Sequence, residues 1–326
     1  MKVCCFPGTD AQGQAAFREL DERLYPGRVN PPPPPPDSAA LFCVMDDGRV
    51  EAHAAAVVNP ALPESAGLLG WFEAENNPEA ATMLFDAVQA HFAGRGFSSV
   101  IGPMNGSTWA AYRVALPEGT PFFLDVESMP YYAELFENNG FETVASYHST
   151  RADLSEQSFP RLERMTPVFR ARGVTVRDFE PDNAEAILRE IHELSLESFK
   201  HNFLYTPVPV EAFLQKYLPL LVKVPPQCIL LARDGAGRLV GFLFAIPNLL
   251  RRDRRELVIK TLAVRPEAVS RGLGAYLVEL CSRRAYESGV RTVYHALMHD
   301  ANPSANIGRA GMAVCRRYRL YRRTRP

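Results

Sequence analysis

The chain has no long run of apolar residues, although 47% of its 326 residues are hydrophobic. No stretch approaches the roughly 20 residues that a membrane-spanning helix needs, and no basic segment at the start leads into an apolar core. The formal net charge of −1 also lacks the positive excess of a general nucleic-acid or membrane-surface binder. These absences predict a cytoplasmic protein that binds neither nucleic acid nor membranes.

The six cysteines form no Cys-x-x-Cys pair and have no histidine at metal-ligand spacing. Most of them lie inside apolar runs, as buried reduced thiols do in proteins of a reducing compartment. We therefore expect no disulfide framework and no metal.

At 326 residues the chain is comfortable for two domains, each large enough to bury its own core. Its most informative stretch is 257–289. Residues 257–264 are mostly apolar or β-branched and precede Pro266, which predicts a strand that ends there. A short loop follows with the sequence Arg271-Gly272-Leu273-Gly274, and apolar residues then recur at helical spacing.

The order of strand, glycine-bearing loop and helix indicates an anion site. The first backbone N–H groups of a helix have no intrahelical partner, and the helix dipole adds positive potential behind them. Glycines allow a phosphate to approach these amides closely. The loop has neither the third glycine of a dinucleotide fingerprint nor the Gly-Lys-Ser/Thr ending of a P-loop. From these residues alone, an ordinary strand-to-helix turn explains the pattern equally well.

The residues that follow extend this order. Residues 292–298 predict another strand, Asn302 and Ser304 are good capping residues for a short helix, and alternation from Cys315 predicts a final strand. Together with Leu262-Ala263-Val264-Arg265-Pro266 and the glycine-bearing loop, this order resembles the acyl-CoA-binding core of the GNAT superfamily of N-acyltransferases. The resemblance covers the last third of the chain.

The resemblance implies acetyl-CoA as co-substrate and assigns residues to it. In that family a strand backbone pairs with the pantetheine arm, loop amides hold the pyrophosphate, and an asparagine of the later helix touches the cofactor. The cofactor-binding residues implied here are Leu262, Ala263, Val264, Arg271, Gly272, Leu273, Gly274, Ala275, Asn302 and Ser304. One position departs from the family pattern, because Val269 stands where Gln or Arg is usual.

Acyl transfer to an amine needs a group that accepts the ammonium proton and often an acid for the thiolate. The family's strand carboxylate corresponds to Val258 and its tyrosine acid to Arg309, so both are missing from their usual places. We expect the catalytic substitutes among Glu256, on the same strand face, and Tyr294 and His295 on the following strand. A surface role for Glu256 and a structural role for His295 explain these two residues as well.

The N-terminal half repeats the order of the C-terminal half. Both halves read as hairpin, strand, helix, glycine, strand, a turn with Asn and Ser, and a final strand. In place of the Gly-x-Gly loop the first copy has residues 75–79, where Pro78 and two glutamates would disfavour a pyrophosphate. After the Asn- and Ser-bearing turn we expect a short helix at residues 109–114.

We therefore predict an α+β fold of two tandem GNAT-like domains, each a central, mostly antiparallel twisted sheet flanked by helices. Residues 1–155 would form a diverged copy without acyl-CoA binding, 156–172 a linker, and 173–326 the acyl-CoA-binding domain. The expected function is N-acetyl transfer to a small-molecule or protein amine, and the expected assembly includes a homodimer. A non-catalytic acyl-CoA sensor or scaffold stays open, because the usual acid and base are missing. An enzyme that uses aminoacyl-tRNA is disfavoured by the near-neutral charge.

Overall fold

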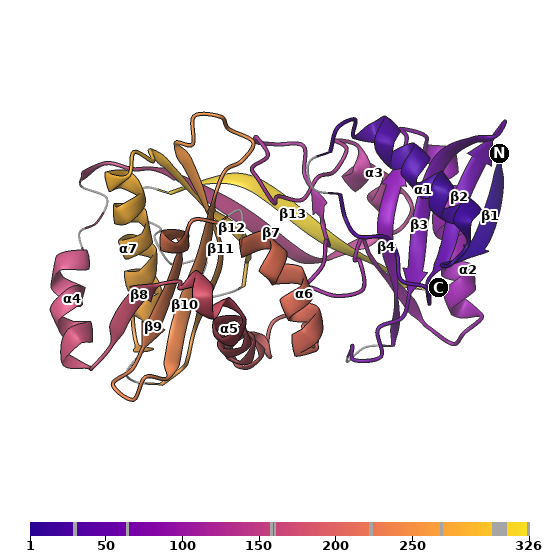
Figure 1. Cartoon of the computed structure of the whole chain (residues 1–326). Helices are drawn as coiled ribbons and strands as arrows, with labels where there is room; N and C mark the ends of the chain where they lie inside the picture. The colour runs from indigo at the N-terminus through magenta and orange to yellow at the C-terminus, as the bar shows by residue number, and fades with distance from the viewer. Residues whose placement is uncertain are drawn as a thin grey trace.

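The computed structural model describes residues 1–326 except 29–30, 63–64, 157–158, 160, 222–223, 268–269, 302–311 and 325–326. Two halves of similar architecture follow each other along the chain (Figure 1). The N-terminal half contains β1 (Lys2–Pro7), α1 (Ala11–Leu24), β2 (Ala40–Asp46), β3 (Arg49–Val57), β4 (Ala66–Ala74), α2 (Pro78–Ala93), β5 (Ser99–Gly102), β6 (Val114–Ala115), α3 (Tyr132–Asn138) and β7 (Glu142–Asp153). The C-terminal half contains α4 (Leu162–Ala171), β8 (Thr175–Asp178), α5 (Ala184–Phe199), α6 (Val210–Leu221), β9 (Ile229–Arg233), β10 (Leu239–Pro247), β11 (Glu256–Val264), α7 (Leu273–Glu287), β12 (Thr292–His299) and β13 (Ala313–Thr324), with short 3-10 helices at Pro181–Asn183 and Pro226–Cys228.

One sheet runs through both halves. Its thirteen strands in the described part of the chain are ordered β1-β2-β3-β4-β5-β13-β7-β12-β11-β10-β9-β8, and β6 pairs with β13. Two of the pairings are parallel, β4 with β5 and β11 with β12, and they occupy corresponding places in the two halves. The predicted α+β fold of two mostly antiparallel sheets with flanking helices is confirmed, with the two sheets joined into one.

The two halves exchange their last strands. β13, at the end of the chain, pairs with β5 of the N-terminal half, while β7 pairs with β12 of the C-terminal half. β7 and β13 also pair with each other, and Figure 1 shows both strands running from one half into the other. Without this exchange β5 and β12 would expose unpaired backbone N–H and C=O groups along a sheet edge. The domain division at residues 155 and 173 stays a prediction.

Helices cover both faces of the sheet in each half. In the C-terminal half, α5 and α6 bury one apolar cluster against β9–β11, and α4 and α7 bury another on the opposite face. In the N-terminal half, α2 and α3 pack on one face and α1 on the other. No helix within the described residues is long and apolar enough to cross a membrane.

Two segments differ from the sequence-based expectation. The short helix expected at residues 109–114 is wrong, because Arg113 has a φ of +85° and its N–H donates to the carbonyl of Pro103 at 2.9 Å. Hydrogen bonds across this loop, such as Asn105 N–H to the Ala111 carbonyl at 2.9 Å, replace those that a helix would form. The segment expected as a linker contains α4, which packs on α7 with the rings of Phe169 and Tyr276 4.8 Å apart.

Candidate functional site

The strands β11 and β12 pair at one end and separate at the other. Their parallel pairing extends only from Glu256 and Thr292 to Ile259 and His295, although both strands continue beyond these residues. On its other edge β11 stays paired with β10 as far as Val264. The backbone groups of residues 260–264 on the β12 side therefore face an opening rather than another strand of the described residues.

Irregularities in both strands produce this separation. The β10–β11 register shifts so that Thr261 and Ile259 have neighbouring partners, which leaves Lys260 as the extra residue of a bulge. The β7–β12 register shifts between His295 and Met298, where Leu297 has a φ of +63° and its N–H donates to Ser149 Oγ at 3.0 Å. Bulges bend a strand, so each strand turns at the point where the pairing ends.

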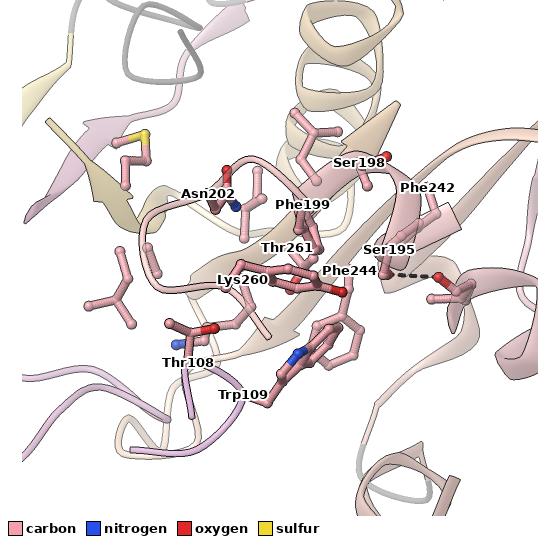
Figure 2. Close-up of a pocket in the computed structure, with 18 of the residues that line it drawn as sticks. Thr108, Trp109, Ser195, Ser198, Phe199, Asn202, Phe242, Phe244, Lys260 and Thr261 are labelled. Atoms are coloured by element: carbon pink, nitrogen blue, oxygen red, sulfur yellow. Dashed lines mark hydrogen bonds between the residues drawn. The ribbon is translucent and has the colours of Figure 1, made fainter. Parts of the chain in front are cut away.

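A cavity of about 850 Å³ occupies this opening and extends to the N-terminal half. Residues 259–264 of β11, residues 295–299 of β12, and the helices α5 and α6 line it on the C-terminal side. Figure 2 shows Thr108 and Trp109, from the N-terminal half, beside Lys260 of β11 and Phe199 of α5. The wall is mainly aromatic and aliphatic, with a small set of polar side chains, as expected for a small-molecule site. Both halves therefore contribute to one cavity.

The helix that follows β11 begins at the same end as the opening. α7 starts directly after Gly272, which has a φ of +82° and provides no side-chain cap, so no side chain occupies the amides of its first turn. A Cβ added at Gly272 would meet only the Met165 side chain, at 3.6 Å. In contrast, the first turn of α2 is capped by Asn77, whose side chain accepts from the N–H of Ala80 at 3.1 Å. Of these two corresponding helices, α7 therefore presents first-turn amides without a side-chain cap to a phosphate group, whereas α2 does not.

The corresponding opening between β4 and β5 is filled. Their pairing also ends early, at Leu68 and Ile101, but the following backbone crosses the gap. The N–H of Met104 donates to the carbonyl of Leu69 at 2.8 Å, and Asn105 Oδ1 accepts from the N–H of Trp71 at 2.7 Å. A linear arm therefore finds the β4 edge at this gap already hydrogen-bonded by residues 104–105.

Of the three predicted catalytic residues, His295 alone lines the cavity. Burial lowers the pKa of His295 to about 4, so its imidazole is neutral at pH 7. Tyr294, on the other face of β12 from His295, belongs to the apolar cluster under α5 and α6 and packs against Phe122, with ring centroids 5.1 Å apart. Glu256 lies at the paired end of β11 and accepts from Asn248 Nδ2 at 2.6 Å. The catalytic roles of Glu256 and Tyr294 stay predictions, and neither residue lines the cavity.

The predicted cofactor-binding residues fall into three groups. Leu262, Ala263 and Val264 line the cavity. Residues 271–275 form the loop end and first turn of α7, at the same end of the sheet. Asn302 and Ser304, together with Val269 and Arg309, lie outside the described residues.

Three cavity residues were not identified from the sequence. Lys260 is the lone charged residue in an otherwise apolar strand interior, and this was an available signal. Trp109 and Arg113 belong to the turn after β5, and only the strand exchange brings this turn to the C-terminal cavity. Desolvation lowers the pKa of Lys260 to about 8, and its Nζ donates to the Leu124 carbonyl at 2.8 Å. No group of three or more His, Cys, Asp or Glu among the described residues is arranged to hold a metal ion.

Comparison with known proteins agrees with this geometry. Residues 188–307 match the model of the Acetyltransferase (GNAT) family, so the C-terminal half contains a GNAT domain. A search of curated proteins finds no match.

Solved structures match over nearly the whole chain. A GCN5-related N-acetyltransferase from Sphaerobacter thermophilus is 19% identical with a TM-score of 0.54, covering 99% of this chain and 96% of that one. A tandem GNAT protein from the clavulanic acid biosynthesis pathway is 13% identical with a TM-score of 0.56, covering 99% and 98%. A glucosamine N-acetyltransferase region of a fungal multi-domain β-N-acetylglucosaminidase is 16% identical with a TM-score of 0.59; it covers 98% of this chain, which spans 38% of that protein. At these identities the matches establish the tandem GNAT fold.

Proposed function

We propose that the protein is an N-acetyltransferase that moves the acetyl group of acetyl-CoA to an amine, with the cofactor held by the C-terminal half. The observation that carries this proposal is the separation of β11 and β12 beyond Ile259 and His295. It leaves a free strand edge along the cavity, and the uncapped first turn of α7 lies at the same end. A neutral arm fits the free edge, and a pyrophosphate fits the free amides.

Each part of the proposed cofactor site has a separate task. The backbone of residues 262–264 would hydrogen-bond the pantetheine arm, and the amides of residues 271–275 would hold the pyrophosphate. The cofactor contacts expected of Asn302 and Ser304 stay predictions. Bound there, acetyl-CoA supplies an acetyl group that is activated as a thioester. The aromatic side chains of α5, α6 and the Trp109 turn would exclude water from it.

We propose that Lys260 is the general base, which accepts the proton that the reacting amine loses. Its side chain lines the cavity at the bulge of β11, where the two strands separate. Because desolvation lowers its pKa to about 8, a large share of Lys260 is neutral at slightly alkaline pH and able to accept a proton. His295, with a pKa of about 4, would remain neutral and act as a hydrogen-bonding group beside the reacting atoms.

Calorimetric titration with acetyl-CoA tests the cofactor site. The intact chain is compared with a Gly272→Asp, Gly274→Asp variant, which places two carboxylates at the proposed pyrophosphate amides. Micromolar binding by the intact chain and loss of binding in the variant are expected. Gly48→Asp is the matched control, because Gly48 has a similar φ of +84°, no neighbouring atom within 4 Å and a place in the N-terminal half. Equal binding by the double variant would contradict the site.

A turnover assay distinguishes an N-acetyltransferase from a non-catalytic acyl-CoA sensor. Release of free thiol from acetyl-CoA in the presence of a panel of amines is the expected result. Tight acetyl-CoA binding without thiol release across amino acids, amino sugars, polyamines and peptide amines would instead support a non-catalytic acyl-CoA sensor. The missing tyrosine acid and strand carboxylate are the features that favour that alternative.

A further inference from the structure

Arg113 is a cation from the N-terminal half that is fixed against the cavity of the C-terminal half. It lines the cavity, yet the whole residue is only 7% exposed. Its guanidinium carbon lies 3.7 Å from the ring centroid of Tyr112 and 3.9 Å from that of Tyr147. The two rings lie at 86° to each other and enclose the guanidinium from two sides, and the φ of +85° fixes the backbone beneath it. The side chain is thus rigid before any ligand arrives.

This guanidinium lacks a full set of partners. The Tyr147 hydroxyl is a side-chain hydrogen-bond partner of the guanidinium, whereas Arg113 Nε and Nη1 are buried and have no hydrogen-bond partner among the described residues. Asp125 is a nearby carboxylate, but it pairs with Arg316 Nε at 3.0 Å and accepts from the Tyr318 hydroxyl at 2.7 Å. A buried cation without a counter-ion is costly, and a guanidinium stays charged at neutral pH. The arrangement is that of a site prepared for an anion.

The charge of the cavity wall agrees with an anionic ligand. Arg113 and Lys260 line it, whereas the described lining residues include no Asp or Glu. An acceptor whose sole charge is an ammonium group would find no counter-charge in this wall.

The remaining wall fits an apolar body. The indole of Trp109 packs against Phe199, Tyr205 and Phe213, with ring centroids 6.4, 5.9 and 5.8 Å away. Trp109 Nε1 donates to the Thr206 carbonyl at 2.9 Å, so the ring is held in place. Aromatic walls of this kind accept a large apolar side chain.

We propose that the acceptor is an amino acid with a large apolar side chain, whose carboxylate pairs with Arg113 while its amine reaches the acyl group beside Lys260. This inference rests on the proposed function for the identity of the reaction. The carboxylate site itself rests on the geometry of Arg113 and can be tested without turnover. A bidentate guanidinium–carboxylate pair adds both affinity and orientation.

The test is a binding comparison between two ligands that differ in one charge. N-Acetylphenylalanine, the expected product type, is titrated against its uncharged amide in a Trp71→Phe background. Trp71 and Trp109 are the two tryptophans of the chain, so the remaining fluorescence reports on the cavity. The acid is expected to bind about 10–100-fold more tightly than the amide, as for a hydrogen bond to a charged group.

Substitutions test whether Arg113 causes the preference for the acid over the amide. Arg113→Met is expected to bring the affinities of the acid and the amide to within a few-fold, whereas Arg317→Met, at an exposed arginine of β13, keeps the preference. Equal binding of acid and amide by the Trp71→Phe protein would overturn the inference, and this result does not depend on the folding of any Arg113 variant. A preference that survives Arg113→Met in a folded variant would also overturn it.

A separate acetyl-CoA titration distinguishes this inference from the proposed function. A protein that binds acetyl-CoA but shows no preference for the acid contradicts the carboxylate site alone. A protein that prefers the acid but does not bind acetyl-CoA supports the carboxylate site and contradicts the proposed function.

Discussion

Lys260 Nζ donates a hydrogen bond to the backbone carbonyl of Leu124 across 2.8 Å. Lys260 occupies the bulge of β11, and Leu124 belongs to the loop after β6 in the N-terminal half, where its φ is +61°. The diverged half therefore orients a side chain of the cavity that lies in the other half. This contact gives the N-terminal copy a task that does not require it to bind acyl-CoA.

The first prediction concerns the pH dependence of transfer. If neutral Lys260 accepts the amine proton, kcat/KM should rise with pH through about 8 and then level off, because the deprotonated form is the active one. Lys260→Met should lower kcat by roughly 100-fold or more and remove the rise of kcat/KM with pH. The profile is measured with two amines of different pKa, so that titration of the substrate is recognised by its shift.

The control for Lys260 is Lys216 of α6. Its pKa is also lowered by burial, and its Nζ donates to the Trp109 carbonyl, but it is not among the residues that line the cavity. Lys216→Met should keep the rise of kcat/KM with pH and move it to somewhat higher pH, because the Lys216 charge helps to lower the pKa of Lys260. If kcat/KM of Lys260→Met still rises with pH near 8, Lys260 is not the general base.

A second prediction follows from the buried imidazole of His295. Its folded-state pKa of about 4 lies below the ordinary value of 6.5, so the unfolded chain binds more protons between these pH values. The free energy of unfolding should therefore fall as pH decreases from 6.5 to about 4, by roughly 3 kcal/mol from this residue. His295→Gln should make the denaturation midpoint less sensitive to acid in this window. An unchanged pH slope in the variant would show that His295 titrates normally.

A third prediction addresses the exchanged strand β13. The hydroxyl of Tyr318, which is buried, lies 2.7 Å from Asp125 Oδ1 and 3.0 Å from Ser149 Oγ on β7. Tyr318→Phe leaves a buried carboxylate with one partner fewer and should lower the free energy of unfolding by about 1–3 kcal/mol. Since both halves share β13, calorimetry should show one cooperative transition at a lower temperature rather than the loss of one of two transitions.

Tyr321→Phe is the matched control on the same strand. The Tyr321 hydroxyl donates to Glu137 at 2.9 Å, and the Glu137 side chain is 44% exposed. Water can replace this bond, so a loss below about 1 kcal/mol is expected. Equal losses for the two substitutions would mean that the Asp125 contact contributes nothing specific.

Much of the fold was accessible from local sequence signals. The β-branched run of 257–264, the Gly-x-Gly loop and the Asn77–Pro78 start of α2 each specify a strand, turn or helix through neighbouring residues alone. Strand exchange was not accessible, because alternation shows which face of β7 or β13 is buried but not which strand lies beside it. The pairing is decided by contacts between residues far apart in the sequence.

The candidate site likewise contains residues that local sequence could predict and residues that it could not. Leu262, Ala263 and Val264 were predicted as site residues because they belong to one continuous segment, and they line the cavity; their contact with a cofactor stays a prediction. Arg113 was missed because its role depends on a positive φ and on two rings, one of them Tyr147 on an exchanged strand. A side chain that reaches a site through tertiary structure has no spacing to reveal it.

The last prediction tests whether the N-terminal opening is closed by packing. A Cβ at Gly70 of β4 would lie 2.6 Å from the Met104 carbonyl oxygen and 3.0 Å from the Asn105 Cα, both backbone atoms of the crossing segment. Gly70→Ala should therefore lower the free energy of unfolding by about 1–3 kcal/mol. Gly94→Ala, whose Cβ would have its nearest neighbour at 3.5 Å, should be nearly neutral. Acetyl-CoA affinity should be the same in both variants, because the proposed cofactor site lies in the other half; a drop confined to Gly70→Ala would place cofactor binding in the N-terminal half.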